Sequence, residues 1–293
     1  MDAGSTDTFV AHRNLLFTVA YELLGSAADA EDVLQETWLR WAGVDASRVE
    51  DGRAYLVRIT ARQSLNRLRA LKRRREAYVG QWLPEPILTV PDVAEDVELA
   101  ESVSMAMMVV LERLAPTERA VFVLREVFDV GYGEIAEAVG KSPAAVRQIA
   151  HRARRHVAAR RPQRAVSPAE TRAAVESFRR ALETGDPQEL LDVLAPDVVL
   201  LSDGGGVKRA APEPVVGADR LIAFYRGGLE GTLTCEPATV NGGPALLLRL
   251  DGELDGIMAV RVEGGRIAGL YYVRNPAKLG HVAGGTPLTL RSA

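Results

Sequence analysis

Two short helical patterns separated by one glycine constrain the fold of this 293-residue chain most strongly. The first pattern runs from Tyr132 to Val139, and Gly140 ends it. Ser142 and Pro143 then open a second helix, because serine is a good N-cap residue and proline fits the first helical position. Two short helices joined by a tight turn that contains glycine predict a helix-turn-helix.

The second helix of this motif has two contrasting faces. The apolar face comprises Val146, Ile149, Ala150, Ala153 and Val157. The polar face has no acidic residue and comprises Arg147, Gln148, His151, Arg152 and Arg155. Arginine and glutamine can bind base edges in the DNA major groove, and further arginines can hold phosphates. We therefore expect a DNA-recognition helix; a solvated basic face is the alternative.

The distribution of charge, rather than the net charge of −3, also indicates nucleic acid. From Gly52 to Arg75 there are nine lysines or arginines and no acid. One narrow arc of the long helix predicted from Arg53 onward comprises Arg58, Arg62, Asn66, Arg69 and Arg73. Like charges this close repel each other, so the arc predicts contact with a polyanion; a solvated basic face is the alternative.

The segment from Asp29 to Trp41 precedes this basic helix and has an apolar stripe and a separate polar one. The polar stripe comprises Asp29, Asp32, Glu36 and Arg40. Two interpretations stay open from the pattern alone. The segment is either an ordinary amphipathic surface helix or an acidic docking face for a partner with basic side chains.

Proline and glycine divide the rest of the chain. Three prolines and Gly80 exclude a continuous helix over 77–96. Trp82 and Ile87 are nevertheless too apolar for a free linker. We therefore expect this linker to dock on another part of the protein. After a second linker at 160–168, helices precede strand-like runs at 232–240, 245–250, 256–262 and 266–274. This order predicts an α+β domain in which helices pack on the concave side of a curved sheet.

Cysteine content and hydropathy bound the cellular context. The single Cys235 excludes an internal disulfide and a cysteine-based zinc site. No signal-peptide pattern opens the chain, and no apolar run approaches the ~20 residues of a membrane span. We expect a soluble cytoplasmic protein with no metal and no cofactor.

Together, the motifs over residues 7–162 resemble a bacterial ECF (extracytoplasmic function) RNA polymerase sigma factor. The run DAEDVLQETWLRW resembles sigma region 2.2, and LVRITARQSLNRLRALKRRRE resembles regions 2.3 and 2.4. The segment from Leu114 through the helix-turn-helix resembles region 4. Residues from about 167 to 285 are similar to SnoaL-like domains, which have the NTF2-like fold of a cone-shaped α+β barrel.

Three short motifs mark the sigma factors that carry such a fused domain. They are WLPEP at 82–86, DGGG at 203–206 and NP-x-KL at 275–279, where Ala277 replaces the usual aspartate. The resemblance implies two all-α sigma domains followed by the α+β domain. The implied boundaries are 1–76 for region 2, 77–96 for the linker, 97–162 for region 4 and 163–293 for the C-terminal domain.

The resemblance also implies roles for the polar residues. The clamp of core RNA polymerase would meet Asp29, Asp32, Gln35 and Glu36, and the polymerase flap would meet region 4. The basic arc from Arg58 to Arg73 would follow DNA at the −10 promoter element, and the loop at 43–52 would capture a flipped base. The −35 element would meet Ser142, Arg147, Gln148, His151, Arg152 and Arg155.

An alternative sigma factor controlled in cis is therefore the expected function, with the fused domain in place of a separate anti-sigma protein. We expect the three motifs to meet in space, with Lys278 paired to Glu85 or Asp203. The expected regulatory interface comprises Trp82, Pro84, Glu85, Asp203, Gly204, Gly205, Gly206, Asn275, Pro276, Lys278 and Leu279.

Three other functions compete with this expectation. The C-terminal barrel could sense a small ligand, or it could act as an NTF2-like cyclase or isomerase with His281 or Asp203 as base. Asp251, Glu253 and Asp255 read as turn residues, so no convincing acid–base pair exists and we expect no enzyme. A free-standing helix-turn-helix repressor is the third alternative, which the acidic docking face disfavours.

Overall fold

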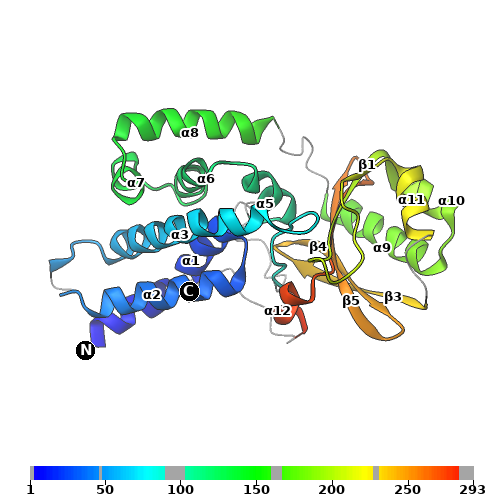
Figure 1. The fold of residues 1–293 in the computed structure, drawn as a ribbon, viewed down its shortest axis with the longest axis horizontal. Helices are drawn as coiled ribbons and strands as arrows, with labels where there is room; N and C mark the ends of the chain where they lie inside the picture. Colours follow the sequence, from blue (N-terminus) through cyan, green and yellow to red (C-terminus); the bar gives the residue numbers. More distant parts are fainter. Residues whose placement is uncertain (1–2, 46–47, 90–102, 160–166, 227–230, 284–293) are drawn as a thin grey trace.

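The computed structural model describes residues 3–45, 48–89, 103–159, 167–226 and 231–283 (Figure 1). The N-terminal half is helical. Its α-helices are α1 (Ala3–Leu24), α2 (Ala27–Ala42), α3 (Gly52–Glu76), α5 (Met105–Glu112), α6 (Pro116–Phe122), α7 (Tyr132–Val139) and α8 (Pro143–Ala158). A five-residue π-helix, η2 (Val123–Val127), continues α6. None of the helices among these residues is long and apolar enough to cross a membrane.

Local chemistry sets the boundaries of the helix-turn-helix as predicted. Gly140 has a φ of +68°, in the left-handed region where glycine is favoured, and ends α7. The Ser142 hydroxyl accepts a hydrogen bond from the amide of Ala145 at 3.3 Å, and Pro143 takes the first position of α8. The five apolar residues predicted on the inner face of α8 are all buried.

One hydrophobic core joins all seven helices. Leu16 of α1 and Leu65 of α3 belong to the same buried cluster as Val121 of α6 and Ile135 of α7. Helix α3 packs against α6 and α7, and α8 lies over these two on the side away from α3 (Figure 1). The −10 and −35 faces predicted from the sequence are therefore parts of one compact body.

The C-terminal half is an α+β domain beside this helical body (Figure 1). It comprises α9 (Pro168–Thr184), α10 (Pro187–Val193), β1 (Leu194–Asp203), β2 (Val215–Val216), α11 (Ala218–Arg226), β3 (Leu233–Val240), β4 (Gly243–Leu250), β5 (Glu253–Glu263), β6 (Arg266–Val273), the 3-10 helix η3 (Pro276–Lys278) and α12 (Gly280–Ala283). The predicted strands are confirmed within a few residues at each end.

The six strands form one sheet in the order β2-β1-β6-β5-β4-β3. Among the described strands, β1 and β6 pair in parallel and the other pairs are antiparallel. The predicted fold class is confirmed, but β2 and β3 are free ends of the order, so the sheet is open rather than a closed barrel. Helices α9 and α11 pack on the sheet, and the buried side chains of Phe178, Tyr225, Met258 and Tyr272 belong to the core of this domain.

Candidate regulatory interface and nucleic-acid-binding faces

The carboxylate of Asp203, at the end of β1, joins the linker to the C-terminal domain. The Tyr78 hydroxyl donates to its Oδ1 at 2.6 Å, and the Leu83 amide donates to its Oδ2 at 2.9 Å. The Lys278 ammonium also donates to Oδ2, at 2.7 Å. Asp203 is fully buried. The three predicted motifs thus meet at one carboxylate, and of the two acids considered as partners of Lys278, Asp203 is the one it pairs with.

Lys278 sits in an aromatic cage built by the linker. Its Nζ lies 4.0 Å from the ring centroid of Trp82 and 5.0 Å from that of Tyr78. The same ammonium donates to the Leu83 carbonyl, and Asn275 Nδ2 donates to the Tyr78 hydroxyl at 2.7 Å. A partly desolvated cation over an aromatic face is stabilised by up to about 2 kcal/mol. The cage therefore adds to the attraction of the Asp203 carboxylate.

The glycine triplet lets the chain turn within this site. A side chain at Gly204 would collide with the carbonyl of Lys208, and one at Gly205 would collide with the Asn275 amide. Gly205 and Gly206 have φ values of +62° and +74°, which disfavour other residues. Around the triplet, Leu279 is buried with Leu83, Pro84 is buried, and Pro276 is exposed.

Glu85 faces the opposite way, into the helical body. Its Oε2 accepts a hydrogen bond from the amide of Ala27 at 2.8 Å, at the positive N-terminal end of α2. Its backbone amide donates to the Gly25 carbonyl at 2.9 Å, and its carbonyl accepts from the Tyr21 hydroxyl at 2.6 Å. Glu85 is buried, so the WLPEP segment binds the α1–α2 corner with one side and Asp203 with the other.

Asn241 is an interface residue that the sequence pattern did not predict. Its Nδ2 donates to the Tyr21 hydroxyl at 2.6 Å and to the Val103 carbonyl at 2.9 Å. Its Oδ1 accepts from the Ile87 amide at 3.0 Å, and Leu88 forms a β-bridge with Val240. The pattern Asn-Gly-Gly signals only a hairpin turn, and nothing local indicates that this asparagine is buried between α1, the linker and the chain before α5.

The predicted −35 face lies on the surface. Arg147, Gln148, His151, Arg152 and Arg155 are all exposed on α8, and Ser142 is exposed at its start. This face lies on the outer side of the helical body, where α8 is the outermost helix (Figure 1). These side chains are therefore accessible without any rearrangement of α8.

The predicted −10 face is partly covered. Arg62, Asn66 and Arg69 are exposed on α3, and the side chain of Arg73 lies outside the described residues. Arg58 instead pairs with Glu137 of α7, with 2.6 Å between Nη1 and Oε2. A carboxylate from a helix distant in sequence therefore meets one residue of the arc, and contact of the arc with DNA stays a prediction.

The predicted clamp-docking face carries internal contacts as well. Arg67 Nη2 lies 2.6 Å from a carboxylate oxygen of Asp29 and 2.6 Å from one of Asp32. Gln63 donates to Glu36 at 2.8 Å, while Gln35 is exposed. Arg67 and Gln63 were not predicted from the sequence, because both contact α2 and lie outside the basic arc of α3.

Asp255 corrects one expectation about the C-terminal domain. It is a buried residue of β5 and not a turn residue. Burial raises its pKa, but hydrogen bonds from Arg274 and Tyr272 and the charges of Arg274 and Lys208 outweigh burial and lower the pKa overall. A carboxylate held ionised by these partners is a poor general base. The side chain of His281, which was considered as a base together with Asp203, lies outside the described residues.

Comparison with known proteins agrees with this geometry. Residues 8–74 match the family model for Sigma-70 region 2, and residues 104–157 match that for Sigma-70 region 4. The ECF RNA polymerase sigma factor SigJ of Mycobacterium tuberculosis is 38% identical over 97% of this chain and 95% of its own length. The chain belongs to the ECF RNA polymerase sigma factors. It is an alternative sigma factor that directs transcription initiation.

Other relatives agree with this assignment. The probable ECF sigma factor SigI of M. tuberculosis is 33% identical, covering 92% of both chains. The crystal structure of M. tuberculosis SigJ is 34% identical, covers 94% of this sigma factor and 98% of SigJ, and superposes with a TM-score of 0.73. The similarity to SigJ therefore extends through the linker and the C-terminal domain as well as the sigma regions.

Proposed function

We propose that the C-terminal domain holds this sigma factor closed, and that core RNA polymerase opens it at a promoter. Region 2 (residues 8–74) would bind the polymerase clamp and the −10 element, and region 4 (residues 104–157) would bind the flap and the −35 element. The acidic residues of α2, the basic arc of α3 and the outer face of α8 would make these contacts.

One comparison of lengths carries the proposal. Helices α3 and α8 are separated by the layer of α6 and α7, so at about 10 Å per helix layer they lie roughly 20 Å apart. The numbers −10 and −35 are positions along the promoter, so the two elements are about 25 base pairs apart. This separation is roughly 85 Å of B-form DNA. The described arrangement cannot span both elements, so regions 2 and 4 must separate before both bind.

The C-terminal domain is placed to oppose that separation. It contacts the linker through Asp203 and Lys278, and the linker contacts region 2 through Glu85. Through Asn241 it also binds Tyr21 of region 2 and the Val103 carbonyl just before α5. Because the domain is tethered to both regions, its effective concentration is high and modest contacts suffice.

Run-off transcription with core polymerase tests the proposal. Asp203→Asn would remove the charge that Lys278 needs and release the linker, so transcription by the full-length variant should rise at limiting core polymerase. Asp197→Asn is the matched control, because Asp197 is exposed on the same strand. Unchanged or reduced transcription by the Asp203 variant, together with demonstrated loss of linker docking, would contradict the proposal.

A further inference from the structure

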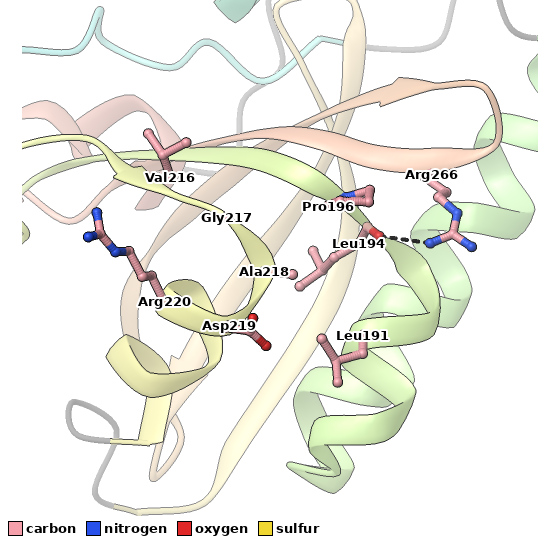
Figure 2. Close-up of a pocket in the computed structure, with 9 residues that line it drawn as sticks. All are labelled: Leu191, Leu194, Pro196, Val216, Gly217, Ala218, Asp219, Arg220 and Arg266. Atoms are coloured by element: carbon pink, nitrogen blue, oxygen red, sulfur yellow. Dashed lines mark hydrogen bonds between the residues drawn. The ribbon is translucent and has the colours of Figure 1, made fainter.

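A pocket opens at the edge of the C-terminal domain (Figure 2), at the end of the β1–β6 pair opposite to Asp203. Its volume is about 410 Å³. Small-molecule sites usually have volumes of about 300–1,000 Å³. Its walls come from α10, from the starts of β1, β6 and α11, and from β2.

Both apolar and polar groups line the pocket. Leu191 of α10 and Leu194 of β1 face the interior in Figure 2, and Pro196 and Val216 complete the apolar wall. Val216 is 47% exposed, although it is a large apolar residue of an edge strand. Covering such surface with an aliphatic group is favourable by about 25 cal/mol per Å².

Three charged residues line the same pocket and give it a net charge of +1. Arg220 and Arg266 contribute two positive charges, and Asp219 contributes one negative charge. Arg266 Nη1 donates to the Leu194 carbonyl at 3.2 Å, which orients the guanidinium and leaves its other N–H groups available (Figure 2). Within the described part of the chain, neither arginine forms an ion pair.

We propose that this pocket binds a small amphipathic monocarboxylate. Its aliphatic part would cover Leu191, Pro196 and Val216, which are not buried. Its carboxylate would accept hydrogen bonds from Arg266, because guanidinium and carboxylate geometries match. Asp219 disfavours a second negative charge, so the ligand carries one acidic group. The site would make the C-terminal domain responsive to a metabolite of this class.

Two strands connect the pocket to the linker interface. Leu194 of β1 pairs with Ile267 of β6 at the pocket, and Asp203 pairs with Val273 at the other end. Just beyond β6, the amides of Arg274 and Asn275 donate to the Asp203 carbonyl at 2.7 Å and 3.0 Å. Both strands therefore start at the pocket and end at the Asp203 site. Strand β1 has ten residues and spans about 33 Å.

This connection gives the ligand a regulatory role that rests on the proposed function. A ligand between α10 and α11 contacts the start of β1, and the end of β1 holds the carboxylate that binds Tyr78, Leu83 and Lys278. Trp82 lies over Lys278, so its fluorescence reports on the interface. Ligand binding shifts the docking equilibrium only to the extent that the docked and undocked states differ in affinity.

Titration of the full-length protein with sodium decanoate tests the site by calorimetry. We expect saturable binding that weakens at least about tenfold in Arg266→Gln, the loss of one charge-assisted pair. Val216→Glu should abolish binding, because it places a negative charge in the pocket at an exposed position. Arg249→Gln on β4 lies outside the pocket and should leave binding unchanged. Decylamine should not bind. Absence of saturable decanoate binding, or binding unaffected by both pocket variants, would overturn the proposal.

Tryptophan fluorescence tests the connection in the same samples. Decanoate should change the Trp82 emission, and Trp82→Phe should remove this change while binding persists, because Trp38 and Trp41 lie in region 2. Decanoate binding without any change in Trp82 emission would overturn the regulatory role. These experiments involve no polymerase, so their failure is distinguishable from failure of the closed-state proposal, which Asp203→Asn tests by transcription.

Discussion

Arg58 of region 2 and Glu137 of region 4 form an ion pair at 2.6 Å across the interface of α3 and α7. Arg58 belongs to the basic arc proposed to follow −10 DNA, so the Glu137 carboxylate takes the place that a phosphate would need. Both side chains are partly exposed, and such a pair is worth about 0–1 kcal/mol. The pair therefore competes with DNA but does not by itself hold the regions together.

Glu137→Gln should strengthen binding of the free, full-length sigma factor to single-stranded −10 DNA. The gain should be at most about fivefold, because the lost competition is worth about 1 kcal/mol or less. Fluorescence anisotropy with a labelled oligonucleotide measures it. Glu253→Gln removes an exposed acid from the C-terminal domain and controls for the change in net charge; an equal gain in both variants would show that Arg58 is not specifically released.

Asp203→Asn should destabilise docking of the linker strongly. The variant leaves the Lys278 ammonium, only 12% exposed, without its ionic partner. Breaking one side of a buried pair costs about 3–5 kcal/mol. Limited proteolysis within 77–89 should accelerate in Asp203→Asn and stay at the wild-type rate in Asp197→Asn. Equal cleavage rates in the two variants would show that the carboxylate does not hold the linker.

Asn241→Gly should loosen the contact between the C-terminal domain and region 2. Glycine tolerates the φ of +53° at this position, so the variant removes only the side chain. The Ile87 amide then loses its side-chain acceptor, and the Val103 carbonyl and Tyr21 hydroxyl lose a donor. Each buried group left unsatisfied costs about 1–3 kcal/mol. Hydrogen exchange of the Ile87 amide should become faster, and exchange within α8 should stay unchanged. Protection of the Ile87 amide equal to that in wild type would show that Asn241 does not hold the linker.

The Asp255–Arg274 ion pair should make the C-terminal domain sensitive to acid. The pKa of Asp255 is lower in the folded state than its unfolded value of about 3.9, so its stabilisation is present above that pH and is lost as pH falls further. The difference in free energy of unfolding between wild type and Asp255→Asn should therefore shrink below about pH 4. Urea titrations at several pH values measure this difference, and a constant difference down to pH 3 would contradict the assignment.

Arg147→Ala should reduce promoter affinity without reducing stability, because the side chain is exposed on α8. A specific arginine–base contact is worth about 1–3 kcal/mol of discrimination, so the loss should be larger on the cognate −35 sequence than on a scrambled one. Gel-shift titrations of the holoenzyme at fixed salt compare the two DNAs. Arg180→Ala, at an exposed position of α9, is the control; equal losses on both DNAs would indicate a phosphate contact instead.

Local signals account for what the sequence predicted well. Gly140, Ser142 and Pro143 determine the turn and start of α8 through contacts within a few residues, and the strands follow from alternating or continuous apolar runs. The three motifs pointed to one interface, and Asp203 and Lys278 pair within it. The open sheet was not predicted, because closure depends on how far the edge strands β2 and β3 extend.

Contacts between distant segments account for what was missed. Glu137 is 79 residues from Arg58, and Asn241 is 220 residues from Tyr21. Glu137 reads as an ordinary surface residue and Asn241 as an ordinary turn residue in its own segment. Asp255 follows a turn in sequence and still lies on a buried strand, because Arg274 and Tyr272 offset its charge there. Only the tertiary packing shows that these polar side chains have partners.

Single-molecule energy transfer between dyes at Ala42→Cys and Ala158→Cys directly measures the separation of regions 2 and 4. Both positions are exposed. The native Cys235 does not compete for the dyes, because burial and the nearby Glu183 carboxylate raise the pKa of its thiol to about 12 and keep it unreactive. We predict a single high-transfer population in the free protein, a low-transfer population in the promoter complex with core polymerase, and partial opening in Asp203→Asn without polymerase. High transfer that persists in the promoter complex would contradict the account.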